Sequence, residues 1–243
     1  MGALFSTPYH WPNASRAAVT LTYDGTRRGH AELVLPLLDS IGLHGTFFVE
    51  PTTFLEDPST WCAAAERGHL LGNGCLLSAA NPDGTLPRWT KAAIASEIDA
   101  TDQLLKEFKV GGERSPFAFP WGQPLCADHE DYRELLEASF RLGRSGVEGY
   151  NAPTSCECSY LRCLMLDGYT LEEIQRVVQG GIDRNSWIIL AFEGIGEGER
   201  SVDLATHHQL VKWLAEDPTL TLGTLSSIAE LIQQANPARL GLG

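Results

Sequence analysis

Residues 45–49 read Gly-Thr-Phe-Phe-Val, a continuous run of apolar and β-forming residues. Such a run, without alternating polar positions, is typical of a strand that is buried on both faces in a parallel sheet. Other short apolar runs predict further strands, and they lie at residues 16–23, 69–73, 117–119, 140–145, 160–166, 187–192 and 220–222. The chain is therefore expected to form a sheet of several mostly parallel strands.

Helical patterns separate these strands. Apolar residues at helical spacing predict helices near residues 30–41, 58–67, 90–108, 132–138, 171–179, 204–214 and 225–234. Alternation of strands and helices without a linker predicts one α/β domain over residues 1–243. About seven strand–helix units favour a distorted (β/α) barrel of about seven strands. In such barrels the functional residues lie at the C-terminal ends of the strands.

The chain is acidic, with 18 Lys and Arg residues against 31 Asp and Glu residues and a formal net charge of −13. Nucleic acid and anionic membrane surfaces are therefore not expected as partners. The sequence has no run of about 18 apolar residues, and no basic segment precedes an apolar run at its start. We accordingly expect no membrane span, no signal peptide and a cytoplasmic location. The oligomeric state is left open.

Three cysteines lie close together in the sequence, at Cys156, Cys158 and Cys163. Their spacing is not the CxxC spacing of ordinary zinc sites. Reduced thiols are therefore the expected state, and the role of this cluster is left open.

The predicted strand ends carry the residues that could take part in catalysis or ligand binding. These ends are residues 22–26 (TYDGT), 46–50 (TFFVE), 68–74 (GHLLGNG), 119–122 (FPWG) and 190–194 (LAFEG). In this order they resemble the motifs of the polysaccharide deacetylase family, also called carbohydrate esterase family 4 or the NodB-homology fold. The resemblance covers about residues 16–232 and implies a single NodB-type barrel domain over the whole chain.

The family's chemistry implies a metal-dependent deacetylase that hydrolyses a C–N or ester bond on an acetylated sugar. In the family, the first Asp of a D-D pair activates water, while the second Asp and two histidines hold a divalent metal that is usually zinc-like. The metal polarises the acetyl carbonyl and the attacking water. An Arg orients the base, and a late His protonates the leaving amine.

This sequence departs from the family pattern at most of those positions. Asp24 matches the base. The metal-ligand positions are Gly25, Gly74 and Ser78, the arginine position is Ala118, and the acid position is Glu193. Zinc needs about three or more nitrogen, sulfur or carboxylate ligands, and glycine has no side chain to donate. We therefore predict no metal cofactor and loss of the family's metal-dependent activity.

Five residues remain candidates for the site. Asp24 and Glu193 are the candidate catalytic carboxylates, and Glu193 follows six apolar residues, which favours a role in acid catalysis. Glu50, at the end of another strand, is a candidate substrate-binding carboxylate. Tyr23 and Trp121 are candidate substrate-binding aromatics, and Trp121 takes the place of the family's Tyr.

Three interpretations stay open. The first is a carbohydrate-binding or regulatory pseudoenzyme whose partner is a carbohydrate or another small molecule. The second is a carbohydrate hydrolase that uses Asp24 and Glu193 without a metal, with carboxyl groups about 5–5.5 Å or roughly 6.5–9.5 Å apart. The third is a metal held by new ligands such as Asp24, Glu50 and Glu193. We expect Asp24 and Glu193 to share a mouth cavity with Trp121 near its rim.

The histidines are expected to lie outside the site. His69 is predicted to be a hydrogen-bonded core residue because it belongs to a short buried strand. His207 and His208, on a C-terminal amphipathic helix, are predicted to be surface residues.

Overall fold

The strands close into a parallel barrel in the computed structural model, which describes residues 9–75, 89–112, 114–127, 129–138, 141–196, 198 and 200–235. Within these ranges, seven strands follow one another in chain order, and the last pairs with the first. They are β1 (Ala17–Asp24), β2 (Thr46–Val49), β3 (Leu70–Asn73), β4 (Phe117–Ala118), β5 (Gly143–Glu148), β6 (Leu161–Met165) and β7 (Trp187–Phe192). The predicted seven-stranded (β/α) barrel is confirmed.

Strand β1 has hydrogen-bonded neighbours along both of its edges. Along one edge it pairs over residues 18–23 with β7, and along the other it pairs with two strands in succession. Its first half pairs with β10 (Leu220–Leu222), and its second half pairs with β2. Because both edges are occupied, the end of β1 at Asp24 has a fixed position at the barrel mouth.

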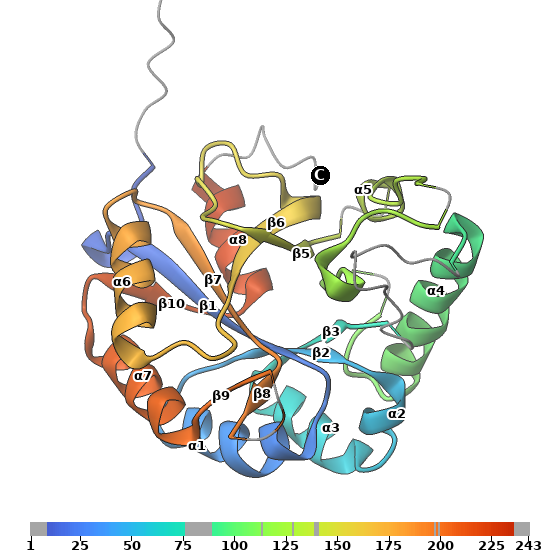
Figure 1. Cartoon of the computed structure of the whole chain (residues 1–243), viewed down its shortest axis with the longest axis horizontal. Coiled ribbons are helices and arrows are strands. Elements are labelled where there is room, and N and C mark those ends of the chain that lie inside the picture. The colour runs from blue at the N-terminus through green and yellow to red at the C-terminus, as the bar shows by residue number, and fades with distance from the viewer. Residues whose placement is uncertain are drawn as a thin grey trace, which may run out of the picture.

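Helices surround the barrel (Figure 1). They are η1 (Pro12–Ala14), η2 (His30–Val34), α1 (Leu35–Ser40), α2 (Pro51–Phe54), α3 (Pro58–Glu66), α4 (Lys91–Glu107), η3 (Pro120–Gly122), α5 (Glu134–Glu137), η4 (Cys158–Tyr160), α6 (Leu171–Ile182), α7 (Leu204–Glu216) and α8 (Leu225–Ala235). Every predicted helix has a counterpart among them. None of the described helices combines the length and apolar character that crossing a membrane requires.

Side-chain caps explain several helix starts. The carboxylate of Asp57 accepts from the backbone N–H of Thr60 at the start of α3. Thr170 and Glu173 form a reciprocal capping box at the start of α6. These caps satisfy N–H groups that have no partner within the helix. A small additional sheet, β8 (Gly194–Ile195) with β9 (Ser201–Val202), follows β7 and was not predicted.

The two faces of β1 lie in different environments. Val19, Leu21 and Tyr23 belong to the core cluster shared with helices α1, α3, α6 and α7. Ala18, on the opposite face, belongs to a second cluster with Trp187 and residues of α8. Because side chains alternate along a strand, Tyr23 and Asp24 point to opposite faces. Tyr23 therefore packs beneath the helices, and Asp24 lies at the mouth.

Tyr23, which was predicted to be a substrate-binding aromatic, lies in the core and not at the mouth. The ring is fully buried and stacks with Phe47 and Phe192 on the neighbouring strands, with centroids 4.8 and 5.2 Å away. Its hydroxyl lies 3.0 Å from Nε2 of His207.

His207 is likewise misplaced by the sequence prediction, because it is fully buried rather than exposed. It lies on the buried face of α7 together with Leu210, Val211 and Leu214. The prediction for His69 is confirmed: its buried ring accepts from the backbone N–H of Gly45 and contacts Asp39.

Candidate functional site

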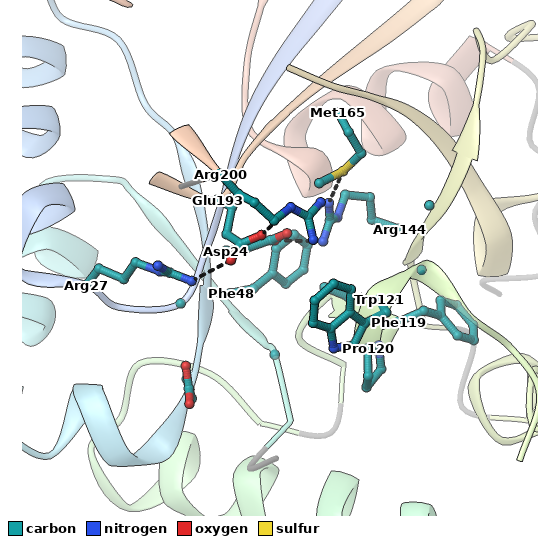
Figure 2. Close-up of a pocket in the computed structure, with 16 residues that line it drawn as sticks. Asp24, Arg27, Phe48, Phe119, Pro120, Trp121, Arg144, Met165, Glu193 and Arg200 are labelled. Carbon is teal, nitrogen blue, oxygen red and sulfur yellow. Dashed lines mark hydrogen bonds and ion pairs between the residues drawn. The ribbon is translucent and has the colours of Figure 1, made fainter. Parts of the chain in front are cut away.

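A cavity of about 460 Å³ opens at the C-terminal ends of the strands (Figure 2). It is lined by Asp24, Gly25, Arg27, Phe48, Glu50, Gly74, Ala118, Phe119, Pro120, Trp121, Gly122, Arg144, Gly146, Met165, Glu193 and Arg200. Four of the five candidate site residues are therefore brought together, since only Tyr23 is absent from this wall.

Asp24 is held by an arginine that sequence reasoning missed. Nη2 of Arg144 donates to Oδ1 of Asp24 at 2.7 Å, and the Arg144 side chain is only 4% exposed. Its guanidinium lies 5.0 Å from the centroid of the Phe48 ring. Although burial acts to lower the pKa of Arg144, the Asp24 carboxylate raises it above the usual value.

Arg144 occupies the position beside the one where the family arginine is missing. The register of β4 and β5 pairs Ala118 with Arg144, so the two residues lie side by side on adjacent strands. An arginine next to the candidate base is therefore present, but it comes from the next strand. The sequence carried one signal for it, because Arg144 lies within the segment predicted as a strand at residues 140–145, together with Arg141.

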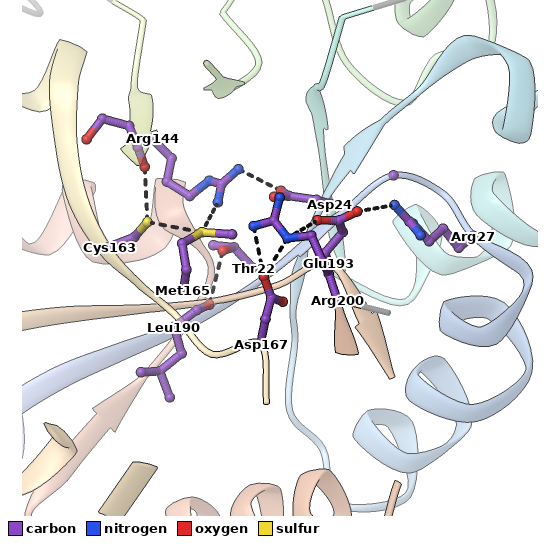
Figure 3. Close-up of polar contacts among 12 residues, drawn as sticks. Thr22, Asp24, Arg27, Arg144, Cys163, Met165, Asp167, Leu190, Glu193 and Arg200 are labelled. Carbon is purple, nitrogen blue, oxygen red and sulfur yellow. Dashed lines mark hydrogen bonds and ion pairs between the residues drawn. The ribbon is translucent and has the colours of Figure 1, made fainter. Parts of the chain in front are cut away.

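Glu193 lies between two further arginines (Figure 3). Nη2 of Arg27 donates to Oε1 at 3.0 Å, and Nε of Arg200 lies 3.1 Å from Oε2. Arg200 also contacts Oδ2 of Asp167, through Nε at 3.0 Å and Nη2 at 2.9 Å. Two guanidinium groups on one carboxylate stabilise its negative charge. Both oxygens of Glu193 are therefore held by arginines.

Glu50 differs from the other two carboxylates. It precedes α2 as the N-cap residue, and its Oε1 accepts from the hydroxyl of Thr52 at 3.4 Å. No ion pair joins Glu50 to another residue in the described ranges. Glu50 is therefore the wall's carboxylate without an arginine partner in the described part of the chain.

Trp121 combines exposure with backbone strain. Its side chain is 52% exposed, although large aromatic side chains are normally well covered. Its backbone has φ 52° and ψ 20°, a left-handed conformation that is unfavourable for a bulky residue. The guanidinium of Arg200 lies 5.1 Å from the ring centroid. Strain of this kind concentrates at functional sites, which makes Trp121 a candidate ligand platform.

The family's metal does not fit the residues present. Gly25 has φ +78°, where any side chain is strained. A Cβ at Gly74 would lie 2.8 Å from the carbonyl oxygen of Val49 and 3.1 Å from the backbone carbon of Phe48, so the backbone leaves no room for a histidine there. The third position, Ser78, lies outside the described residues.

The cysteine cluster lies beside the barrel interior. The thiol of Cys163 is buried and donates to the carbonyl of Ser145 at 3.0 Å. Burial raises the pKa of Cys163, and a hydrogen bond with Cys156 together with burial raises the pKa of Cys158. Raised pKa values make these thiols weak nucleophiles.

A model of the polysaccharide deacetylase family matches residues 12–137, just over half of the 243 residues. The chain belongs to the polysaccharide deacetylase family. The match includes Asp24, Gly25 and Gly74, so the departures from the family's metal ligands lie inside the matched segment. A comparison with curated protein sequences found no match.

Solved structures show the same fold at low identity. The PuuE allantoinase superposes with a TM-score of 0.70 at 12% identity, covering 96% of both chains. The peptidoglycan N-acetylglucosamine deacetylase Bc1960, in complex with a naphthalenyl N-oxidanyl-benzamide, gives 0.61 at 17% identity over 93% of this chain and 98% of its own. A family 4 carbohydrate esterase from Streptomyces lividans, in complex with acetate, gives 0.57 at 17% identity over 85% and 91%.

Proposed function

We propose that this polysaccharide deacetylase family member binds a carbohydrate and lacks the family's metal-dependent deacetylation. The observation that carries the proposal is the backbone around Gly74. A side chain there would meet the carbonyl of Val49 at 2.8 Å, so a metal ligand cannot be accommodated without moving a buried strand. Gly25 adds a second position without a ligand atom. Without a metal, the carbonyl and the water lose their Lewis-acid activation.

The remaining wall suits sugar recognition. Trp121 presents an exposed ring, and aromatic faces are suited to packing against sugar rings. Asp24 uses Oδ1 for Arg144, while Glu50 has no arginine partner among the described residues. Carboxylate oxygens of this kind accept hydrogen bonds from sugar hydroxyl groups. Among the structural relatives, enzymes named for sugar substrates support a carbohydrate as the ligand class.

A metal-free carbohydrate hydrolase is the second candidate, because Asp24 and Glu193 line one cavity. The arginines argue against it. An acid catalyst needs a carboxyl oxygen that can reach the leaving group, whereas Arg27 contacts Oε1 of Glu193 and Arg200 contacts Oε2. A binding role needs neither group to change its protonation state.

Two measurements on the whole chain test the proposal. Calorimetric titration with chito- and xylo-oligosaccharides should give saturable binding. Acetate release from acetyl-chitooligosaccharides and acetylxylan should stay at background, with and without added zinc or cobalt. Acetate release at the rate of an active family enzyme, abolished by Asp24→Asn, would contradict the proposal.

A further inference from the structure

Three arginines gather in one cavity of an acidic protein. The chain has only 18 Lys and Arg residues and a formal net charge of −13, yet Arg27, Arg144 and Arg200 all line the mouth cavity. Arg144 is buried at 4% exposure, whereas the side chains of Arg27 and Arg200 are 36% and 41% exposed. The two outer arginines are therefore accessible to a ligand.

The carboxylates of the same wall differ in the number of arginines that they contact. Asp24 is paired with Arg144, and Glu193 is shared by Arg27 and Arg200. Glu50 is the wall's carboxylate without an ion pair in the described ranges. The two arginines around Glu193 are balanced in charge by Glu193 and by Asp167, which Arg200 also contacts, while Glu50, the residue that follows β2, forms no ion pair in the described ranges.

Arg27 and Arg200 each use only some of their guanidinium nitrogens in the contacts of the described residues. In the described part of the chain, Arg27 binds Glu193 through Nη2 alone. Arg200 binds its two carboxylates through Nε and Nη2. A guanidinium carries five N–H donors in a planar fork that matches a carboxylate. A ligand with clustered acceptor oxygens would use the donors that remain.

The position of Arg200 links this donor group to the aromatic platform. Its guanidinium lies 5.1 Å from the ring centroid of Trp121, while it also contacts Glu193 (Figure 2). Because the guanidinium lies over one face of the indole ring, a sugar ring that packs along the edge of Trp121 lies next to Arg200. A carboxylate attached directly to that ring would reach the guanidinium without a long spacer.

We propose that the mouth cavity selects a sugar that carries a carboxylate, a uronic acid residue, with its ring on Trp121 and its carboxylate bound by Arg200 and Arg27. This inference rests on the proposed carbohydrate binding and names the class of sugar. Sulfate and phosphate esters of sugars present similar acceptor oxygens, so they form separate arms of the test.

The experiment compares each acidic sugar with its neutral counterpart. Uronic acid oligosaccharides of gluco and galacto configuration are titrated calorimetrically against their methyl esters, which keep the ring and remove the charge. Sugar sulfates, sugar phosphates and cationic amino-sugar oligomers complete the set. The free acid of at least one configuration should bind about tenfold more tightly than its ester, a preference that shrinks as salt is raised.

Variants tie this preference to the arginines. Arg27→Gln and Arg200→Gln should each reduce the acid-to-ester ratio at least about threefold, because each removes one charge-assisted contact. Affinity for the ester should change less. Arg16→Gln is the matched control, because among the described residues the Arg16 side chain pairs only with Asp183, in an exposed 3.5 Å contact, and it does not line the cavity.

The outcomes separate this inference from the proposed function. Equal or tighter binding of the esters or the amino sugars overturns the carboxylate preference and leaves carbohydrate binding standing. Tighter binding of sulfates or phosphates than of carboxylates also overturns the assignment. If no sugar of any charge binds, the proposed function fails and this inference fails with it.

Discussion

Asp24 and Arg144 are 120 residues apart in the sequence, yet their side chains meet at 2.7 Å across the barrel mouth. The two residues differ in environment, because the Arg144 side chain is 4% exposed and that of Asp24 is 26% exposed. The carboxylate can be hydrated if it loses its partner, whereas the guanidinium cannot. The pair is therefore asymmetric in its contribution to stability.

Removing the Asp24 carboxylate should lower the unfolding free energy more than breaking an exposed ion pair does. Asp24→Ala leaves the buried guanidinium of Arg144 uncompensated, and breaking a buried pair costs on the order of 3 kcal/mol of unfolding free energy. Arg144→Met should cost less, because the exposed carboxylate regains water. Chemical denaturation of both single variants and the double variant measures the coupling. Asp183→Ala, which breaks the exposed pair with Arg16, is the control at less than about 1 kcal/mol. A loss for Asp24→Ala no larger than this control would contradict the asymmetry.

A methyl group at Gly74 should be poorly tolerated. Gly74→Ala places Cβ 2.8 Å from the carbonyl oxygen of Val49, and overpacking of this kind costs about 1–3 kcal/mol. Gly112→Ala is the matched control, because its Cβ would meet only the Cβ of Lys106, at 3.9 Å. Thermal unfolding of the two variants should separate them. Equal melting temperatures would show that the strand end can move and that a metal ligand could be accommodated at this position.

Replacing Trp121 by glycine should weaken ligand binding without loss of stability. Trp121→Gly removes the platform, which should cost about tenfold or more in sugar affinity, and relieves a backbone conformation that is unfavourable for a bulky residue. Lys109→Gly, at another non-glycine residue with positive φ (58°), relieves the backbone in the same way outside the cavity. Calorimetry should show reduced affinity only for Trp121→Gly. Unchanged affinity would remove Trp121 from the binding site.

Two buried histidines should make the protein sensitive to acid. Burial lowers the pKa of His207 to about 3 and that of His30 to about 4, from 6.5 in the unfolded chain. Below about pH 6.5 the unfolded chain therefore binds protons that the folded chain cannot. As the pH is lowered from about 6.5 to about 4, the unfolding free energy should decrease by up to about 1.4 kcal/mol per pH unit for each histidine. Above about pH 7 both histidines are neutral in either state and contribute no slope.

One substitution on α7 isolates the His207 contribution. His207→Gln keeps a side-chain amide near the hydroxyl of Tyr23 and removes the titrating ring, so it should flatten the slope by about half. His208→Gln, at the exposed neighbouring residue, should leave the slope unchanged. Denaturant titrations between pH 4 and pH 7 supply the data. An unchanged slope in His207→Gln would show that this ring is not the source.

The barrel could be predicted from sequence because its strands are distinct apolar segments. The run at residues 187–192 is fully buried as β7, and the run at residues 45–49 lies between β1 and β3. Burial on both faces removes polar alternation, and that signal is local in the sequence. The β8–β9 pair has only two residues in each strand, which is too short to produce such a signal.

The site was harder to predict, because its partners come from distant segments. Asp24, Glu50, Glu193 and Trp121 were expected from their places at strand ends, and they do line one cavity. Arg144 was missed because a motif comparison reads one strand at a time, whereas the interaction depends on which strands lie side by side. Arg27 and Arg200 lie in segments that follow β1 and β7, where sequence patterns do not define geometry.

His207 was missed although a signal existed. Its spacing to Leu210, Val211 and Leu214 is three, four and seven residues, which is the pattern of one helix face. Treating histidine as polar concealed this pattern. The buried hydroxyl of Tyr23, 3.0 Å away, explains how the ring is accommodated in the core.

The closure of the barrel through β1 and β7 also sets an order of events during folding. The contact joins residues 18–23 to residues 187–192, so the chain must close a loop of more than 160 residues before these strands pair. Contacts of such long range slow folding, because the entropy of loop closure must be overcome first. Until this loop closes, the edge of β1 that pairs with β7 has no partner strand. Since Asp24 and Glu193 extend from the ends of these two strands, their cavity has no counterpart in any intermediate that lacks the β1–β7 contact.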